Sequence, residues 1–382
     1  MKLKTFSHTE ASGWSAPLPV ELDGPQTLVL VFGGRERAYA PQAFEALQAA
    51  FAQSVLLGCS TAGEIAGAQV HDASLSVAVA CFEHSRLALA STDIADAGDS
   101  GAAGRRLAEQ LLAAGDDLNA VFMLSDGLGV NGTPLVAGLA GGLPAGVMIT
   151  GGLAGDGKRF ERSWVLAGRR LGGGQVAAVG LYGRRLQVGS GCAGGWMDFG
   201  PERRITRSDG NVLYELDGKP ALDLYKSYLG ELAQGLPGSA LLFPLSIRRP
   251  VGDGPPLVRT ILGIDEALRS LTFAGDMPEG HVARLMRTTN DSLVGSAAVA
   301  VAQATSGLDP AGDVLVVSVS CVGRRLVLGE RTEEEVETIV DGAPAGAGHV
   351  GFYSYGEISP AAGRTGSDLH NQTMTVTVFS EA

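Results

Sequence analysis

The segment "GFYSYGEISPAAGRTGSDLHNQTMTVTVF" near the end of the chain carries many hydrogen-bonding side chains at the ends of two strand-like runs. They are two phenols, a carboxyl group, an imidazole and two amides: Tyr353, Tyr355, Glu357, His370, Asn371 and Gln372. Polar groups that are buried at strand ends must be paired. A cluster of them beside glycines therefore indicates either an internal hydrogen-bond network or a ligand pocket, and both interpretations stay open.

A second group of residues could bind a phosphate. Gly127, Gly129 and Gly132 in "DGLGVNG" have the G-x-G-x-x-G spacing between an expected strand and an expected helix, and Asp156 follows at a distance that suits a ribose carboxylate. A dinucleotide-binding enzyme that uses the glycine loop at 127–132 is therefore one interpretation. Against it, the loop is not in the first β-α-β unit, and a chain with 55 glycines produces such spacings easily.

Similar polar, glycine-punctuated strand ends occur four times, as "GCSTAGEI" (58–65), "SDGLGVNG" (125–132), "TGGLAGDG" (150–157) and "SCVGRR" (320–325). Ligands of α/β proteins bind at strand ends, so these segments are candidates for one shared site. The sequence contains no Walker A loop, no nucleophile elbow and no H-E-x-x-H motif. Ser320 and Cys321 have no sequence neighbour that suggests a base. The motifs therefore favour ligand binding over catalysis.

The elements that must position these residues alternate along the chain. Strands are expected at 27–34, 54–63, 120–127, 147–152 and 314–323, and helices at 41–53, 99–114, 133–142, 220–232, 288–305 and 332–340. Two echoes occur, Gly-Arg-Arg-Leu at 183–186 and 323–326, each read as a turn after a strand, and Gly-Glu-Ile at 63–65 and 356–358. They are too short to establish a repeat. We predict an α/β protein of two domains, with mixed sheets flanked by helices.

Composition limits the classes of partner. The 382 residues are 45% apolar and carry a formal charge of −12, and the 29 Lys and Arg residues form no basic stripe, so nucleic acid is not an expected partner. The start of the chain has no signal-like apolar stretch, and no run could span a membrane, so we expect a cytoplasmic protein with no membrane partner. Its four cysteines form no C-x-x-C pair, which argues against a zinc cluster or a disulfide framework: Cys59, Cys81, Cys192 and Cys321.

Six segments together resemble one known family. They are "GCSTAGEI", "GGLAGDGKRF", "DGKPALDLY", "SCVGRRLVLGERTEEEVE", "GFYSYGEI" and "LHNQTMTVTV". In this order they resemble the FIST (F-box and intracellular signal transduction) sensory family, from Thr27 to Glu381. The resemblance implies a FIST N-terminal domain at 25–198, a FIST C-terminal domain at 199–382, and a cytoplasmic small-ligand sensor that is not an enzyme.

The resemblance and the strand-end positions together imply a set of ligand-binding residues. The set comprises Cys59, Ser60, Thr61, Gly63, Glu64, Asp126, Gly127, Gly152, Gly155, Asp156, Cys321, Tyr353, Tyr355, Glu357, His370, Asn371 and Gln372.

The chain is similar to a bacterial subset of the family that binds haem and responds to nitric oxide by modulating a partner histidine kinase. No kinase, cyclase or DNA-binding module is recognised within these residues, as in that subset. The resemblance therefore implies haem b as the cofactor, nitric oxide as the ligand and a histidine kinase, or another signalling protein, as the partner in trans. The alternative is a FIST sensor of a small metabolite, such as an amino acid, without haem. A homodimer is considered as well.

A haem iron needs an axial ligand, which is usually histidine. His8, in a terminus that is expected to fray, and His84, at an expected hairpin tip, are poor candidates. His370 fits best because of its polar neighbours. His349 and His281 are its rivals, and both stay open.

Overall fold

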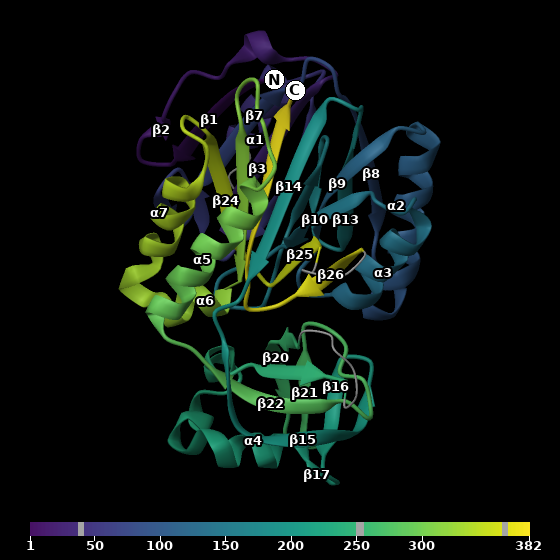
Figure 1. Cartoon of the computed structure of the whole chain (residues 1–382), viewed down its shortest axis with the longest axis vertical. Coiled ribbons are helices and arrows are strands. Elements are labelled where there is room, and N and C mark those ends of the chain that lie inside the picture. Colours follow the sequence, from purple (N-terminus) through teal and green to yellow (C-terminus); the bar gives the residue numbers. More distant parts are fainter. Residues whose placement is uncertain (37–41, 250–255, 361–365) are drawn as a thin grey trace.

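The computed structural model describes residues 1–36, 42–249, 256–360 and 366–382. Figure 1 shows a larger part that contains both termini and a smaller part below it. Residues 1–196 and 288–382 form the larger part, which we call the body, and residues 197–287 form the smaller part, which we call the inserted module. The chain thus leaves the body after its middle and returns to complete it.

The body repeats one plan three times. Each repeat has a leading strand, two parallel strands with one or more helices between them, a short hairpin and a closing strand. The first repeat consists of β1 (Lys2–Thr9), β2 (Gly13–Trp14), η1 (Val20–Leu22), β3 (Thr27–Gly34), α1 (Gln42–Ala50), β4 (Val55–Thr61), β5 (Glu64–Ala66), β6 (Gln69–His71) and β7 (Leu75–Cys81).

The other two repeats follow the same order. The second consists of β8 (Arg86–Asp93), η3 (Ala97–Asp99), α2 (Ser100–Ala114), β9 (Leu118–Ser125), α3 (Gly132–Gly142), β10 (Met148–Leu153), β11 (Val165–Ala167), β12 (Arg170–Gly172) and β13 (Gln175–Tyr182). The third consists of β14 (Leu186–Ala193), α5 (Asn290–Thr305), β23 (Leu315–Cys321), α6 (Val322–Leu328), η6 (Gly329–Arg331), α7 (Thr332–Gly342), β24 (Gly348–Ser354), β25 (Gly356–Pro360), β26 (Ser367–His370) and β27 (Met374–Glu381).

Each repeat gives its hairpin to a neighbouring sheet. The three sheets have the orders β12-β11-β4-β3-β7-β1-β2, β26-β25-β10-β9-β13-β8 and β6-β5-β24-β23-β27-β14. Hairpin β5–β6 therefore extends the sheet of the third repeat, β11–β12 that of the first, and β25–β26 that of the second. This cyclic exchange closes the body into a three-sided structure.

Backbone details confirm the equivalence of the repeats. In each repeat the closing strand pairs with the first of the two parallel strands. The residue two positions before this pairing begins has a left-handed backbone, with φ of 56° at Ala73, 66° at Gly174 and 62° at Gln372. In each repeat the residue after it accepts an N–H from the end of the first parallel strand, in the pairs Gly34 to Ser74, Asp126 to Gln175 and Cys321 to Thr373. The strand ends of the three repeats are therefore constructed alike.

The sheets pack against one another through their inner faces. Phe32 of the first repeat stacks on Phe352 of the third with ring centroids 4.7 Å apart, and Phe122 of the second lies edge-on to Phe379. The outer faces are covered by helices, with α2 and α3 on one side and α5 and α7 on another (Figure 1). Both faces are buried, and this explains why β3 is apolar along its length and not alternating.

The inserted module has a core of its own, in which Ile205, Tyr225 and Phe273 are buried. Its strands form a strongly curved sheet of order β19-β18-β22-β15-β16-β21-β20. The elements are β15 (Met197–Asp209), β16 (Val212–Leu216), β17 (Lys219–Pro220), α4 (Ala221–Leu229), η4 (Gly230–Gly235), η5 (Gly238–Leu242), β18 (Leu245–Arg248), β19 (Leu257–Arg259), β20 (Ile261–Asp265), β21 (Ser270–Phe273) and β22 (Val282–Arg287).

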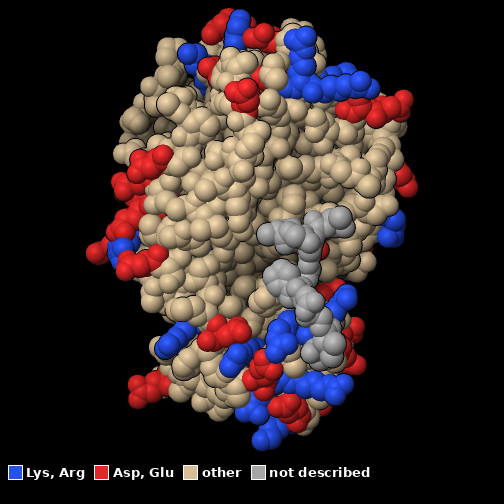
Figure 2. Space-filling model, in the orientation of Figure 1, with Lys and Arg blue, Asp and Glu red and all other residues tan. Residues whose placement is uncertain are grey.

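The surface of the module differs from that of the body. On the face seen in Figure 2, charged residues of both signs crowd the module and the top of the molecule, whereas the middle of the body is almost uncharged. Among the helices of the described residues, none combines the length and apolar character that a membrane crossing requires.

The expected α/β architecture with mixed sheets and flanking helices is confirmed. Three local expectations were wrong. His84 is not at a hairpin tip, because the strands that it joins, β7 and β8, lie in different sheets. The Gly-Arg-Arg-Leu run at 323–326 does not turn a strand but lies in α6, because the chain enters a helix directly after Cys321. His8 is not in a frayed terminus, since β1 pairs with β7 along its length. The division into halves at residue 198 stays a prediction; that position lies inside β15.

Candidate functional site

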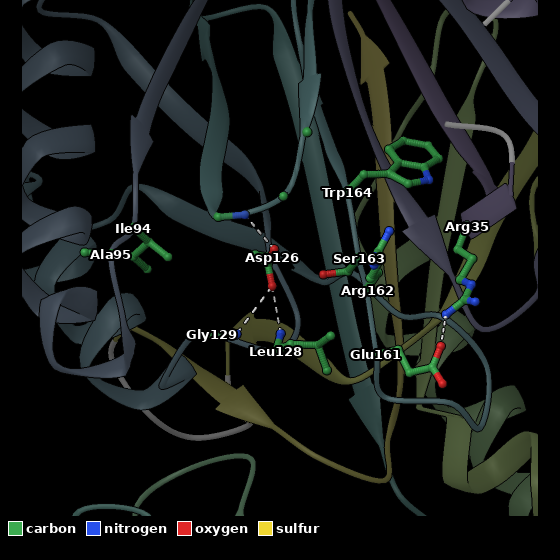
Figure 3. Close-up of a pocket in the computed structure, with 13 residues that line it drawn as sticks. Arg35, Ile94, Ala95, Asp126, Leu128, Gly129, Glu161, Arg162, Ser163 and Trp164 are labelled. Carbon is green, nitrogen blue, oxygen red and sulfur yellow. Dashed lines mark hydrogen bonds and ion pairs between the residues drawn. The ribbon is translucent and has the colours of Figure 1, made fainter. Parts of the chain in front are cut away.

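A cleft of about 450 Å³ opens where β9 and the hairpin β11–β12 end (Figure 3). We call it the main cleft. Its walls come from the first and second repeats and combine apolar, acidic and basic groups with bare backbone: Arg35, Ile94, Ala95, Asp126, Leu128, Gly129, Glu161, Arg162, Ser163, Trp164, Gly172, Gly173 and Gly174. Such a size and mixture are typical of small-molecule sites.

A side cavity of about 170 Å³ adjoins the main cleft through Arg35, which lines both. Its other lining residues are Gly34, Glu36, Thr61, Ala62, Gly63, Glu64, Asp72, Ala73, Asp156, Gly157 and Arg159. A further cavity of about 550 Å³ continues past Asp72 and Gly157 to Arg325. The strand ends of the first two repeats and helix α6 of the third therefore border a row of neighbouring cavities.

Asp126 holds the loop that follows β9. Its Oδ1 accepts the N–H groups of Leu128 at 2.8 Å and Gly129 at 3.4 Å, and its Oδ2 accepts that of Gly174 at 2.8 Å. Figure 3 shows this carboxylate between Ile94 on one side and Ser163 on the other. A carboxylate has about four acceptor positions, so one remains for a ligand.

Arg35 follows β3 directly and supplies the cationic group that lines both cavities. Its Nη1 lies 2.8 Å from Oε2 of Glu161 and 3.1 Å from Oδ2 of Asp156. The Glu161 side chain is 62% exposed, whereas that of Asp156 is fully buried. Arg35 is therefore anchored by one buried carboxylate and paired with a second that water already reaches.

Asp156 orders the loop between β10 and β11. Burial alone would raise its pKa, but hydrogen bonds outweigh burial and hold the pKa below its usual value. Its donors are the N–H groups of Phe160, Glu161 and Arg162, together with the Tyr355 hydroxyl and Arg35. The loop that carries Glu161 and Trp164 is therefore preorganised around one carboxylate.

Glu64 is a buried carboxyl group at the base of the side cavity. It accepts hydrogen bonds from the Thr61 hydroxyl and, at 2.8 Å each, from the N–H and hydroxyl of Ser74. Burial raises its pKa to about 7. Glu357 occupies the equivalent position in the third repeat and has the same type of donors, and burial likewise raises its pKa to about 7.

The predicted ligand-binding residues divide into two groups. Asp126 lines the main cleft, and Thr61, Gly63, Glu64 and Asp156 line the side cavity. The rest of the predicted set does not line any of the three cavities and lies beneath them or beside the module: Cys59, Ser60, Gly127, Gly152, Gly155, Cys321, Tyr353, Tyr355, Glu357, His370, Asn371 and Gln372.

The polar side chains at the ends of β24 and β26 belong to hydrogen-bond networks. Tyr353 donates to Glu335 at 2.7 Å, and Tyr355 donates to Asp156. The amide of Gln372 donates to the carbonyl of Leu241 in the inserted module at 3.0 Å. The internal-network interpretation thus accounts for these contacts without a ligand.

Two of the three candidate histidines, His349 and His370, use ring nitrogens in hydrogen bonds that haem ligation would have to displace. Both ring nitrogens of His349 are engaged, Nε2 with the Ser318 hydroxyl and Nδ1 with the Gly67 carbonyl at 2.8 Å, and burial lowers its pKa to about 4. His370 is buried and holds the Ser359 carbonyl through Nε2 at 2.9 Å. His281 is half-buried in the inserted module, where its carbonyl accepts an N–H from Ile205. A haem site would also require a large apolar slot beside its ligand.

The first glycine of the glycine loop has a packing role that does not involve phosphate. A Cβ on Gly127 would lie 1.7 Å from the carbonyl oxygen of Ala154, so this glycine is required by packing. Both oxygens of Asp156 accept protein hydrogen bonds, so a ribose would have to displace them.

The two potential nucleophiles at the end of β23 are Ser320 and Cys321. Cys321 is buried, which raises the pKa of its thiol, and Ser320 donates to Glu335 at 3.0 Å. Neither group is prepared for nucleophilic attack.

Sequence reasoning missed part of the main cleft, namely Arg35, Ile94, Glu161, Arg162 and Trp164. Arg35 could have been predicted, because it directly follows the buried strand at 27–34. Ligands of α/β proteins bind at strand ends, and this principle selected the other candidate segments. The remaining four residues gave no local signal.

Comparison with known proteins identifies the relatives of the chain. The family model for the FIST N domain matches residues 27–219, and that for the FIST C domain matches residues 221–360. Uncharacterized proteins from two strains of Mycobacterium tuberculosis are each 26% identical over 378 residues, which covers 93% of this chain and 92% of theirs.

Among solved structures, a chorismatase has a TM-score of 0.38 at 11% identity and covers 99% of this chain and 98% of its own. A cyanuric acid hydrolase from A. caulinodans has a TM-score of 0.35 at 12% identity and covers 100% and 98%. Likeness at this level carries no conclusion about the activity of this chain.

Proposed function

The chain belongs to the FIST family of sensory domains, and on that premise we propose that it senses a small ligand that binds in the main cleft. The ligand that the cleft supports best is a zwitterionic metabolite such as an amino acid. One observation carries this proposal: a cation, Arg35, and an anion, Asp126, line the same cleft as an apolar wall.

Each part of such a ligand has a counterpart in the cleft. The guanidinium of Arg35 matches a carboxylate in charge and in the fork of its donors. The remaining acceptor position of Asp126 suits an ammonium group. Ile94, Leu128 and Trp164 supply apolar surface for a side chain.

The ligand's carboxylate would compete with Glu161 for Arg35. An ion pair to an exposed carboxylate contributes only about 0–1 kcal/mol, so its displacement costs little. The buried bond from Arg35 to Asp156 would persist and keep the guanidinium in place.

The output is a contact with another protein, with a histidine kinase in trans as the expected partner class. Ligand binding must then change the affinity of a surface for that partner, since a sensor without turnover can act only by shifting a binding equilibrium. Haem b and nitric oxide, which the resemblance to the haem-binding subset implies, stay a prediction, and the hydrogen bonds of the candidate histidines give them no support.

Titration calorimetry of the whole chain with each of the standard L-amino acids tests the proposal. At least one should bind, and Arg35→Ala should weaken that binding by about tenfold or more, because a charge-assisted bond is lost. Arg170→Ala is the matched control, since Arg170 pairs with Asp93 on the surface and does not line the main cleft. Equal affinity in Arg35→Ala and Arg170→Ala would contradict the assignment.

A further inference from the structure

We propose that the glycine loop at 126–133 couples occupancy of the main cleft to release of the inserted module from the body. The proposal rests on the ligand-binding role of the main cleft given above and assigns the regulation of that site. It gives the loop that resembles a dinucleotide motif a different role, as a mechanical connection.

The loop contacts the cleft at one end and the module at the other. Asp126, Leu128 and Gly129 line the main cleft. A few residues on, Nδ2 of Asn131 donates to Oδ1 of Asp276 in the module at 2.6 Å, and the hydroxyl of Thr133 accepts the N–H of Asp276 at 3.2 Å. A ligand that contacts Leu128 and Gly129 therefore acts on the segment that is hydrogen-bonded to the module. We call the two hydrogen bonds to Asp276 the clasp.

The loop cannot absorb a displacement at its start. Gly127 lies so close to the Ala154 carbonyl that even a methyl group would collide with it, so the chain is pinned there. Beyond Gly129, whose Cβ position faces open space, Val130 packs in the core, the N–H of Asn131 donates to Ser100, and the Asn131 side chain binds Asp276. A movement of Leu128 and Gly129 is therefore transmitted toward the module.

The module occupies the third of three equivalent positions. Gly173, Asp72 and Asn371 correspond to one another, because each precedes the left-handed residue before a closing strand. Gly173 lines the main cleft and Asp72 the side cavity, whereas the amide oxygen of Asn371 accepts the N–H of Thr260 in the module. Two positions are open to ligands and the module fills the third.

At the junction between the docked module and the body, three buried polar atoms of the described residues have no hydrogen-bond partner: Thr260 Oγ1, Asn371 Nδ2 and Gln372 Oε1. Buried groups without partners cost free energy, and water would satisfy them if the module moved away. These three atoms favour release of the module, and they oppose the hydrogen bonds that hold the docked state, from Gln372 to Leu241, from Arg259 to Leu369 and from Asn131 to Asp276. A ligand that also favours release shifts this equilibrium further.

The ligand supplies that bias through Asp126. In the docked form this carboxylate accepts the N–H groups of Leu128 and Gly129. A cationic group of the ligand at the remaining acceptor position of Asp126 draws the carboxylate toward it, weakens these two hydrogen bonds and relaxes the turn that presents Asn131 to Asp276. A ligand that binds better to the relaxed loop favours the released module by the same factor.

Hydrogen–deuterium exchange of the whole chain tests the coupling without knowledge of the ligand. Gly129→Phe fills the main cleft from within, and Gly129→Ala adds only a methyl group in open space. We expect the amides of Thr260 and Asp276 to exchange about fivefold faster or more in Gly129→Phe than in wild type, and at the wild-type rate in Gly129→Ala. Gly129→Leu repeats the test if the larger variant does not fold.

Two variants of the module complete the experiment. Asp276→Ala removes the side-chain bond to Asn131, keeps the backbone N–H bond to Thr133, and should raise the exchange of the module whatever the cleft contains. Asp223→Ala, which removes a surface pair with Arg269, should leave exchange unchanged. Fast exchange in Asp276→Ala with wild-type exchange in Gly129→Phe and Gly129→Leu would overturn the coupling. If no amino acid binds and Gly129→Phe still accelerates exchange, the coupling holds and the ligand class is wrong.

Discussion

Glu64 and Glu357 accept the same set of hydrogen bonds in two different repeats of the body. Each carboxyl group takes one bond from a hydroxyl three residues before it, Thr61 or Ser354, and two from the residue that precedes a closing strand. In the second repeat the equivalent position is Val165, which pairs with Gly172 as Glu64 pairs with His71. The first and third repeats thus bury an acid where the second repeat has an apolar residue.

These buried acids make stability depend on pH. Burial raises the pKa of Glu64 from 4.5 to about 7, so the folded protein binds more protons than the unfolded chain between these values. The contribution of Glu64 to stability is therefore complete below about pH 4.5 and is lost as the pH rises through about 7. Between about pH 4.5 and pH 8, wild type should lose roughly 2–4 kcal/mol of unfolding free energy relative to Glu64→Gln.

Urea unfolding of both proteins across this pH range measures the difference. Glu357→Gln should behave alike, and the double variant should show the flattest pH profile of the three. Glu231→Gln, at an exposed position on η4, is the control and should track wild type. Parallel profiles for wild type and Glu64→Gln would show that the carboxyl group is not protonated preferentially in the fold.

The first glycine of the glycine loop should tolerate no side chain. Gly127→Ala places a Cβ against the carbonyl oxygen of Ala154 and should cost roughly 1–3 kcal/mol or more, as overpacking of a buried site does. Gly129→Ala, two residues on, should change stability by no more than about 0.5 kcal/mol. Thermal unfolding compares the pair, and equal melting temperatures would refute the packing role of Gly127.

The Tyr355 hydroxyl should stabilise the wall of the main cleft from a distance. Tyr355→Phe removes a buried donor to Asp156 and should cost roughly 1–3 kcal/mol. Amides of the 156–162 loop should exchange faster, because Asp156 orders their N–H groups. Tyr228→Phe, at an exposed hydroxyl, is the control. Unchanged exchange in that loop would argue that the hydroxyl does not support the cleft.

Haem ligation is tested by the absorption spectrum of the whole chain after incubation with hemin. From the hydrogen bonds of His349 and His370, we expect no Soret band that depends on either histidine. His370→Ala should instead lower the unfolding free energy by roughly 1–3 kcal/mol, because the Ser359 carbonyl loses its donor.

The opposite outcome would establish the haem sensor that the resemblance implies. A band that shifts with nitric oxide, disappears in His370→Ala and partly returns with imidazole would assign the iron to His370. Parallel His349→Ala and His281→Ala variants show whether a rival is the ligand.

Local sequence patterns were sufficient to predict the class of the protein and the positions of its strand ends. Apolar runs such as 27–34 predict buried strands because their periodicity is local, and glycine-rich polar segments mark where such strands stop. Family motifs are also local strings. The Gly-Glu-Ile echo was visible for the same reason, although two matches of three residues could not reveal three repeats.

Which strand ends meet could not be predicted without the three-dimensional fold. Hairpin β5–β6 pairs with β24, far away along the chain, and no local pattern encodes such an exchange between sheets. The exchange of hairpin β11–β12 onto β4 joins the first and second repeats, whose residues Arg35 and Asp126 line one cleft, and the fold puts Gln372 against the inserted module. A hydrogen-bonding side chain has the same local signature whether its partner is a ligand or another strand, because only the fold determines the atoms around it.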